Sequence, residues 1–171
     1  MSQNNRHIEL VLHNIRSAHN VGALLRTADG LAITHVYLSG YTPYPALEND
    51  DRLPHIALKT TKQIAKTALG AEQSVQWSKH KELSSVADKL QVSNTPLVAL
   101  EQTPSAVALH DYDAPDKLAL VLGNEVDGLS KEELALCEQI VELPMLGSKE
   151  SYNVASAGAM ALHWLRFYRK I

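Results

Sequence analysis

Three short apolar runs in the second half of the chain constrain its fold most. They are LVALE (97–101), LALVLG (118–123) and QIVEL (139–143). Each is long enough for a strand and far short of the roughly 20 residues that a membrane span needs. Continuous apolar runs are typical of strands that are buried on both faces. Because helix-type segments follow the last two runs, at 130–136 and 154–169, the order predicts an α/β fold with a mostly parallel sheet flanked by helices.

Strand-type and helix-type segments also alternate in the first half of the chain. No internal repeat, low-complexity tract or linker interrupts them. A chain of 171 residues that is 45% hydrophobic and 20% charged suits one globular domain, which we expect to span 1–171. Strands are expected at 8–12, 35–40 and 74–77, and helices at 20–31, 60–68 and 79–90.

Composition narrows the classes of function. The single cysteine, Cys137, cannot form an internal disulfide, and the N-terminus lacks the basic and apolar segments of a signal peptide. We therefore expect a cytoplasmic protein with no membrane role. The net charge of -3 gives no overall attraction to nucleic acid, so RNA binding would need a local basic patch. The eight histidines form no ligand pattern such as HExxH, and we expect no metal site.

Three loops rich in glycine and polar residues follow predicted strands. They are SAHNVG (17–22), GNEVDG (123–128) and PMLGSKESYN (144–153). In an open parallel sheet, ligands bind where such loops gather, at the carboxyl ends of the strands. The spacing of a phosphate-binding P-loop is absent, which disfavours an ordinary nucleotide-binding enzyme. A glycine-rich turn ahead of a helix capped by Ser130 explains the second loop nearly as well as a ligand site does.

The first loop leads into a helix that carries an arginine near its start. Asn20 is the expected N-cap, and Arg26 lies off the apolar face of the helix. Helical side chains lean toward the N-terminus, so Arg26 would lie over Gly22, which has no side chain in the way. We expect the guanidinium to reach the start of the helix and share a pocket with the loop. A solvated arginine on an amphipathic helix is the alternative.

The chain contains, in order, N-x-G-x-x-x-R-T-A (20–28), G-x-E-x-x-G-L (123–129) and L-P-M-x-G (143–147) followed by S-x-N-V (151–154). These motifs resemble those of the SpoU/TrmH family of the SPOUT superfamily, which are S-adenosylmethionine-dependent RNA ribose 2'-O-methyltransferases. The resemblance covers nearly the whole chain. It implies one SpoU-type catalytic domain at 1–171, without the separate RNA-binding domain that many relatives carry.

The resemblance implies a deep trefoil knot near the C-terminus, which holds the methyl donor, and a homodimer that packs through the knot. A helix rich in small residues at 154–165 suits such an interface. The implied reaction transfers a methyl group from S-adenosyl-L-methionine to a ribose 2'-hydroxyl of tRNA or rRNA, with tRNA slightly favoured. A non-catalytic RNA- or S-adenosylmethionine-binding module of the same fold is the alternative.

The same resemblance implies which residues line the donor pocket. Tyr152 is a departure, since the family usually has Leu or Met there, and it alters the expected pocket wall. The implied cofactor-binding residues are Leu100, Glu101, Leu122, Gly123, Asn124, Glu125, Gly128, Ile140, Leu143, Pro144, Met145, Ser151, Tyr152, Asn153 and Val154.

By the resemblance, Arg26 is the catalytic residue, and Asn20, Ser151 and Asn153 hold Arg26 or the ribose. A guanidinium is effectively never deprotonated in proteins. We therefore expect Arg26 to orient the neighbouring phosphate and to stabilise negative charge on the reacting oxygen. Glu125 is expected to brace its loop or a subunit contact rather than to act as a base.

A local basic patch could bind RNA without an extra domain. Three lysines recur at helical spacing, and Tyr41 and Tyr44 are near enough in sequence to stack on bases. An ordinary solvated lysine face is the alternative. A second cluster, Arg166, Arg169 and Lys170, is equally explained as charge at a helix C-terminus. The patch consists of Arg52, His55, Lys59, Lys62 and Lys66.

Overall fold

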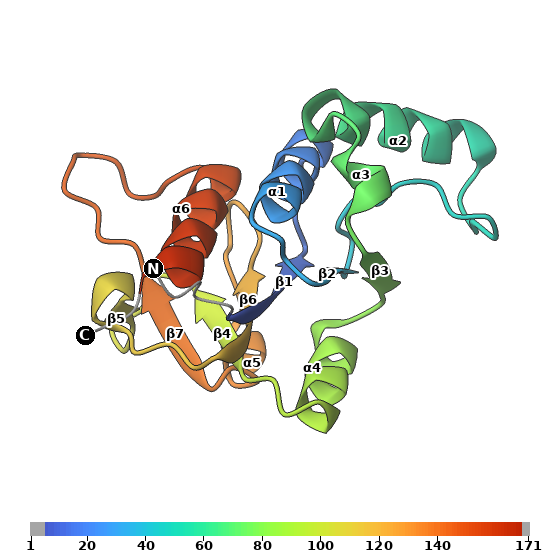
Figure 1. The fold of residues 1–171 in the computed structure, drawn as a ribbon. Helices are drawn as coiled ribbons and strands as arrows, with labels where there is room; N and C mark the ends of the chain where they lie inside the picture. The colour runs from blue at the N-terminus through green and yellow to red at the C-terminus, as the bar shows by residue number, and fades with distance from the viewer. Residues whose placement is uncertain (1–5, 169–171) are drawn as a thin grey trace.

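The structure, a computed structural model, describes residues 6–168, in which a seven-stranded sheet lies between two layers of helices (Figure 1). The strand order is β3-β2-β1-β6-β4-β7-β5, and every adjacent pair is parallel. The mostly parallel α/β fold expected from the sequence is therefore confirmed. The strands are β1 (His7–His13), β2 (Val36–Ser39), β3 (Trp77–His80), β4 (Leu97–Leu100), β5 (Val107–Ala108), β6 (Lys117–Leu122) and β7 (Gln139–Glu142).

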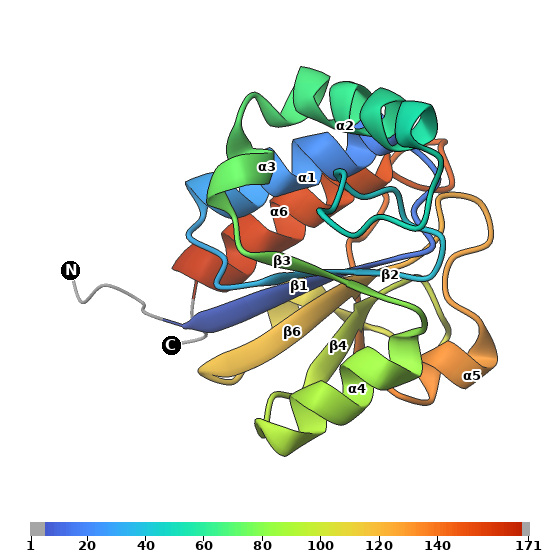
Figure 2. The same cartoon turned by 90° about the vertical axis from the view of Figure 1, so that its right-hand side faces the viewer.

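Helices cover both faces of the sheet, as Figure 2 shows. One face carries α1 (Ala18–Gly30), α2 (Pro54–Ala68), α3 (Ala71–Ser74) and α6 (Val154–Phe167). The other face carries α4 (Leu83–Val92) and α5 (Lys131–Leu134), and a short 3-10 helix, Leu109–Asp111, follows β5. Within residues 6–168, no helix has both the length and the apolar character that a membrane crossing requires.

The central strands are buried on both faces, as their apolar sequences predict. Leu120 and Leu122 of β6 pack in one core with α1 and α6, while Ala119 and Val121 pack in a second core with α4. All four are essentially inaccessible to solvent. Since the strands are parallel, β1, β4, β6 and β7 end at the same edge of the sheet, and their loops meet there.

Several expected boundaries in the first half are wrong. The expected strand at 74–77 is the end of α3 followed by β3, whose pairing with β2 begins only at Trp77. The expected helix at 60–68 begins at Pro54, which suits a first helical position, and the helix expected at 79–90 begins at Leu83. The two-residue strand β5 was not expected, because it is too short to give a pattern and exists through its pairing with β7.

Gly22 marks the close approach of α1 and α2. A Cβ built at this position would lie 2.2 Å from the carbonyl oxygen of Ile64 and 2.2 Å from Oγ1 of Thr67. The Thr67 hydroxyl also donates to the carbonyl of His19, 2.8 Å away. The first helix therefore needs a glycine here because another helix packs on it.

We expect Gly22→Ala to destabilise the fold by roughly 1–3 kcal/mol, because the new methyl group must push backbone atoms of α2 away. Gly30→Ala is the matched control on the same helix, since a Cβ there meets nothing within 4 Å. Alanine is the better helix former, so the control should be neutral or stabilising. Urea unfolding measures both changes, and equal stabilities for the two variants would contradict the close packing at Gly22.

Candidate functional site

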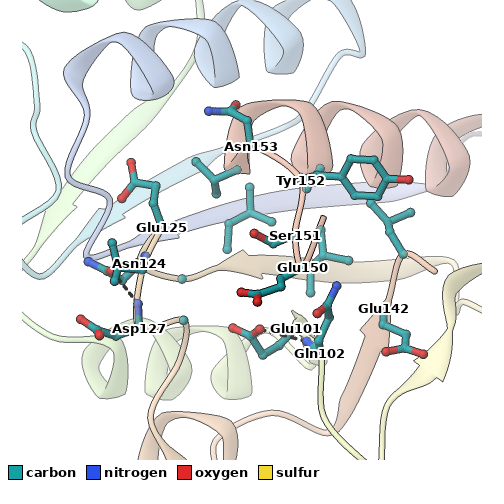
Figure 3. A pocket seen from close by; sticks show the side chains of 18 residues that line it. Glu101, Gln102, Asn124, Glu125, Asp127, Glu142, Glu150, Ser151, Tyr152 and Asn153 are labelled. Carbon is teal, nitrogen blue, oxygen red and sulfur yellow. Dashed lines mark hydrogen bonds between the residues drawn. The ribbon is translucent and has the colours of Figure 1, made fainter. Parts of the chain in front are cut away.

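A cavity of about 590 Å³ opens at the carboxyl ends of β4, β6 and β7 and at the start of α6 (Figure 3). Twelve of the expected cofactor-binding residues line it: Leu100, Glu101, Leu122, Gly123, Asn124, Glu125, Gly128, Leu143, Ser151, Tyr152, Asn153 and Val154. Six more lining residues were not expected from the sequence: Gln102, Val126, Asp127, Glu142, Glu150 and Ala157. We call this space the first cavity.

Three of the expected cofactor-binding residues do not line the first cavity. Ile140 packs against the core on the α4 side of the sheet. Pro144 and Met145 lie in the loop before α6, where Pro144 is exposed. Neighbours in sequence thus point to different sides of the strand and loop, which a motif cannot reveal.

The first cavity combines apolar and acidic groups. Leu100, Leu122 and Leu143 contribute apolar surface, and its five acidic residues are Glu101, Glu125, Asp127, Glu142 and Glu150. Among residues 6–168, no lysine or arginine lines it. Figure 3 shows Asn124, Glu125 and Asp127 on one side of the cavity and Glu142 on the other. The cavity therefore suits a ligand with positive charge and some apolar surface.

The loop after β6 is closed by its own asparagine. Oδ1 of Asn124 accepts hydrogen bonds from the backbone N–H of Val126 at 2.7 Å and of Asp127 at 2.9 Å. Gly128 has a φ of +66°. A Cβ on Gly128 would also lie 2.3 Å from Oε2 of Glu101, which accepts from the N–H of Leu129. Conformation and space both require glycine here.

Glu125 joins this loop to the start of α1. Its Oε2 accepts from the N–H of Arg16 at 2.8 Å, and its Oε1 accepts from the N–H of Ser17 at 3.1 Å and from Nδ2 of Asn20 at 3.0 Å. Burial alone would raise the pKa of Glu125, but these hydrogen bonds outweigh it and hold that pKa below its ordinary value. The ionised carboxylate thus braces the neighbouring loop, whereas the sequence suggested its own loop or a subunit contact.

Asn20 extends this contact to the start of α6. Its Oδ1 accepts from Nδ2 of Asn153 at 3.3 Å, and Oδ1 of Asn153 accepts from the first N–H groups of α6. The prediction that Asn20 caps α1 is wrong. The helix begins earlier, and Ser17 is its N-cap, with a hydroxyl that accepts from the N–H of Asn20. Side chains from all three sequence motifs therefore meet at this edge of the sheet.

Arg26 is not brought to the first cavity. It is six positions after Asn20, which places the two side chains about 120° apart around the helix axis. It is exposed, and it has no hydrogen bond or ion pair with any residue in 6–168. The expected clear path over Gly22 is wrong, because α2 occupies the space beside that glycine. The catalytic role of Arg26 stays a prediction.

In the structure, one residue of the basic patch is held in an ion pair and the other four are exposed. Arg52 forms an ion pair with Asp50, with Nη2 and Oδ2 2.5 Å apart, and holds the pKa of that carboxyl well below its usual range. Its Cζ lies 3.6 Å from the ring centroid of Tyr44, which covers one face of that ring. The rest of the patch is exposed on α2, with no ion pair to residues 6–168, and its RNA contact stays a prediction: His55, Lys59, Lys62 and Lys66.

The second basic cluster is partly structural. Arg166 donates to the carbonyl of Arg6 at 2.5 Å and to that of Ala32 at 2.9 Å, so it joins α6 to the starts of β1 and β2. Arg169 and Lys170 lie outside the described residues. In the part of the chain that the structure describes, no group of three or more His, Cys, Asp or Glu is placed to hold a metal ion.

Relatives with similar sequences carry RNA methyltransferase names. The chain is 30% identical over 154 residues to the 23S rRNA (guanosine-2'-O-)-methyltransferase RlmB of Bordetella pertussis, covering 90% of this chain and 57% of the relative. It is 25% identical over 156 residues to the tRNA (guanosine(18)-2'-O)-methyltransferase of Escherichia coli, covering 91% and 61%. The chain therefore spans less than two thirds of the length of these relatives.

The fold is also that of solved SpoU proteins. The SpoU methyltransferase AviRb from Streptomyces viridochromogenes, in complex with the cofactor AdoMet, is 23% identical with a TM-score of 0.75, covering 94% of this chain and 59% of that chain. The model of the SpoU rRNA Methylase family matches residues 7–163. Because this match extends over nearly the whole chain, the protein belongs to the SpoU rRNA Methylase family.

Proposed function

We propose that the protein transfers a methyl group from S-adenosylmethionine to a ribose 2'-hydroxyl of tRNA or rRNA. The observation that carries the proposal is the contact of Asn20, Glu125 and Asn153, which joins three loops beside one cavity. The names of the two relatives support the same reaction. They include both tRNA and rRNA enzymes, so the slight preference for tRNA stays a prediction.

The residues of the first cavity fit S-adenosylmethionine. The donor carries a positive sulfonium and an ammonium group, and five acidic side chains line the cavity. Its adenine has apolar faces, which the side chains of Leu100, Leu122 and Leu143 suit. The volume of about 590 Å³ lies in the range of small-molecule sites. The bound donor would supply an electrophilic methyl group.

The chain's own residues would mainly position the acceptor. In-line attack on a methyl carbon needs an aligned oxygen. Ser151 and Asn153 line the first cavity just before α6, where they could hold a ribose. Arg26 cannot serve as a base at neutral pH. We expect it to bind an RNA phosphate on the exposed side of α1, and the lysines of α2 to bind others.

The trefoil knot and the homodimer belong to the same proposal. β7 lies between β4 and β5, which are consecutive in the chain, so the last segment enters a region already bounded by earlier ones. That order supports a knot. Exposed apolar side chains along α6 and just before it, Tyr152, Met160 and Phe167, support a subunit interface there. The single domain without an added RNA-binding domain and the cytoplasmic location stay predictions.

A non-catalytic binding module with the same fold is the second candidate. It would bind S-adenosylmethionine or RNA without transferring the methyl group. Arg26→Ala separates the two: we expect it to lower methyl transfer at least about 100-fold, because the RNA phosphate loses its cationic partner and the ribose oxygen is no longer aligned with the methyl group. Donor affinity by calorimetry should be unchanged, because Arg26 does not line the first cavity.

The substrate RNA for this assay comes from cells that lack the protein, with 2'-O-methylation mapped across tRNA and rRNA. Arg26→Lys should retain part of the activity, and Lys81→Ala, an exposed lysine elsewhere, should retain all of it. Full transfer by Arg26→Ala would remove the role of Arg26. Donor binding by the wild type without transfer to any RNA would favour the non-catalytic module.

Glu125→Gln should weaken both the fold and the reaction. The amide nitrogen would face the N–H donors of Arg16 or Ser17, at a cost of roughly 1–3 kcal/mol. Because the folded-state pKa of Glu125 lies below its ordinary value of 4.5, the stabilisation is present above that pH. It is lost as the pH falls further, through the folded-state pKa.

Urea unfolding of the Glu125→Gln variant at neutral and at acidic pH measures this effect. Glu132→Gln, an exposed change on α5, is the control and should alter neither stability nor its pH dependence. A difference between wild type and Glu125→Gln that does not shrink toward low pH would contradict an ionised brace.

Met160→Asp should convert a dimer into monomers, because it places a charge on the exposed apolar side of α6. Val92→Asp changes an exposed apolar residue on α4, at the other face of the sheet, and should leave the dimer intact. Light scattering measures the molar mass of the wild type and of both variants in solution. A monomeric wild type, or a dimer that survives the Met160 change, would place the interface elsewhere.

A further inference from the structure

A second cavity, of about 460 Å³, lies at the start of α1 beside the loop that follows β2. The residues of the three sequence motifs do not line it. Its walls are formed by residues 16–19 before and in α1, by 41–44 after β2, by Arg52 in the loop before α2, and by part of α2. Its lining residues are Arg16, Ser17, Ala18, His19, Tyr41, Thr42, Pro43, Tyr44, Arg52, Thr60 and Gln63.

The second cavity borders the first through two side chains. Asn124, which lines the first cavity, donates from Nδ2 to the hydroxyl oxygen of Tyr41 at 2.5 Å and to the carbonyl of Asn14 at 3.1 Å. Glu125 holds the backbone N–H groups of Arg16 and Ser17. The walls of the two cavities are therefore in direct contact, and ligands in both would be neighbours.

The two cavities have opposite charge. In the described part of the chain, five acidic residues and no basic ones line the first, whereas two arginines and a histidine but no acidic residue line the second. Arg16 and His19 are exposed, and neither side chain has a hydrogen bond or ion pair with residues 6–168. Arg52 is already held by Asp50. Arg16 is therefore the free cationic group of the second cavity, and it favours an anionic ligand with Arg16 as the main contact.

Tyr41 adds an aromatic surface to this site. Its hydroxyl is fixed by Asn124, while the residue as a whole is 60% exposed. A ring that is anchored at one end and open on its face suits stacking with a nucleobase, and base stacking needs no particular sequence. Tyr44 does not serve in the same way, because Arg52 covers its ring.

We propose that the second cavity binds one nucleotide of the substrate RNA, with its phosphate on Arg16 and its base against Tyr41. This inference rests on the proposed function and deepens it. A nucleotide seated there would fix the position of the RNA chain beside the donor. The site would thereby supply RNA recognition within the catalytic domain itself.

The test measures binding of the wild-type chain to a 5'-nucleoside monophosphate, to the matching nucleoside and to single-stranded RNA. Arg16→Ala should weaken binding of the monophosphate but not of the nucleoside, and should lower the salt slope of RNA binding by about 0.7. Tyr41→Ala should weaken RNA binding roughly 10-fold, because stacking is lost. Tyr41→Phe keeps the ring and should stay within about threefold of the wild type.

Two controls keep failure of this site distinct from failure of the methyltransferase proposal. Lys131→Ala removes an exposed charge on α5 and should change nothing. S-adenosylmethionine affinity and melting temperature should be unchanged in the Arg16→Ala variant, because the Arg16 side chain has no partner within residues 6–168. Tyr41→Ala removes a hydrogen bond of Asn124, so it is compared with Tyr41→Phe, which removes the same bond and keeps the ring. The nucleotide site would be overturned by equal binding of nucleoside and monophosphate, or by RNA binding that Arg16→Ala and Tyr41→Ala leave unaltered. Either result is readable even if no RNA is methylated.

Discussion

The carboxylate of Glu125 holds the start of α1 against the loop that follows β6. Three N–H donors from the α1 side converge on it, two from the backbone and one from Asn20. Asn20 in turn contacts Asn153, the N-cap of α6. Three loops that leave the sheet separately are thereby fixed to one another. Without this carboxylate, the backbone N–H groups of Arg16 and Ser17 and the Nδ2 of Asn20 would lose the acceptor that ties them to the loop after β6.

The two cavities on either side of the Glu125 contact differ in charge, and this difference separates the proposed donor and RNA sites. The acidic first cavity suits a sulfonium donor, and the cationic second cavity suits an RNA phosphate. Asn124 contacts both, since it closes its own loop with Oδ1 and holds Tyr41 with Nδ2. A charged donor and a charged acceptor chain can therefore bind next to each other without sharing a site.

The sequence predicted those features that depend on residues close together in the chain. The doubly buried strands followed from continuous apolar runs, whereas most of the residues around the first cavity were implied by the resemblance of the three motifs to a known family. Errors arose where distant partners decide. Position 22 needs glycine because α2 packs directly on it. The start of β3 is set by its pairing with β2, which begins at Trp77. The second cavity was missed because Arg16 and Tyr41 meet only through the fold.

The first cavity, at the ends of β4, β6 and β7, is the proposed donor site. A crystal structure of the protein with S-adenosylmethionine tests it most directly. We predict that the donor lies between Leu100, Leu122 and Leu143, with its sulfonium facing the acidic side chains and the Glu125 contacts intact. Donor density in the second cavity, or elsewhere on the molecule with the first cavity empty, would contradict it.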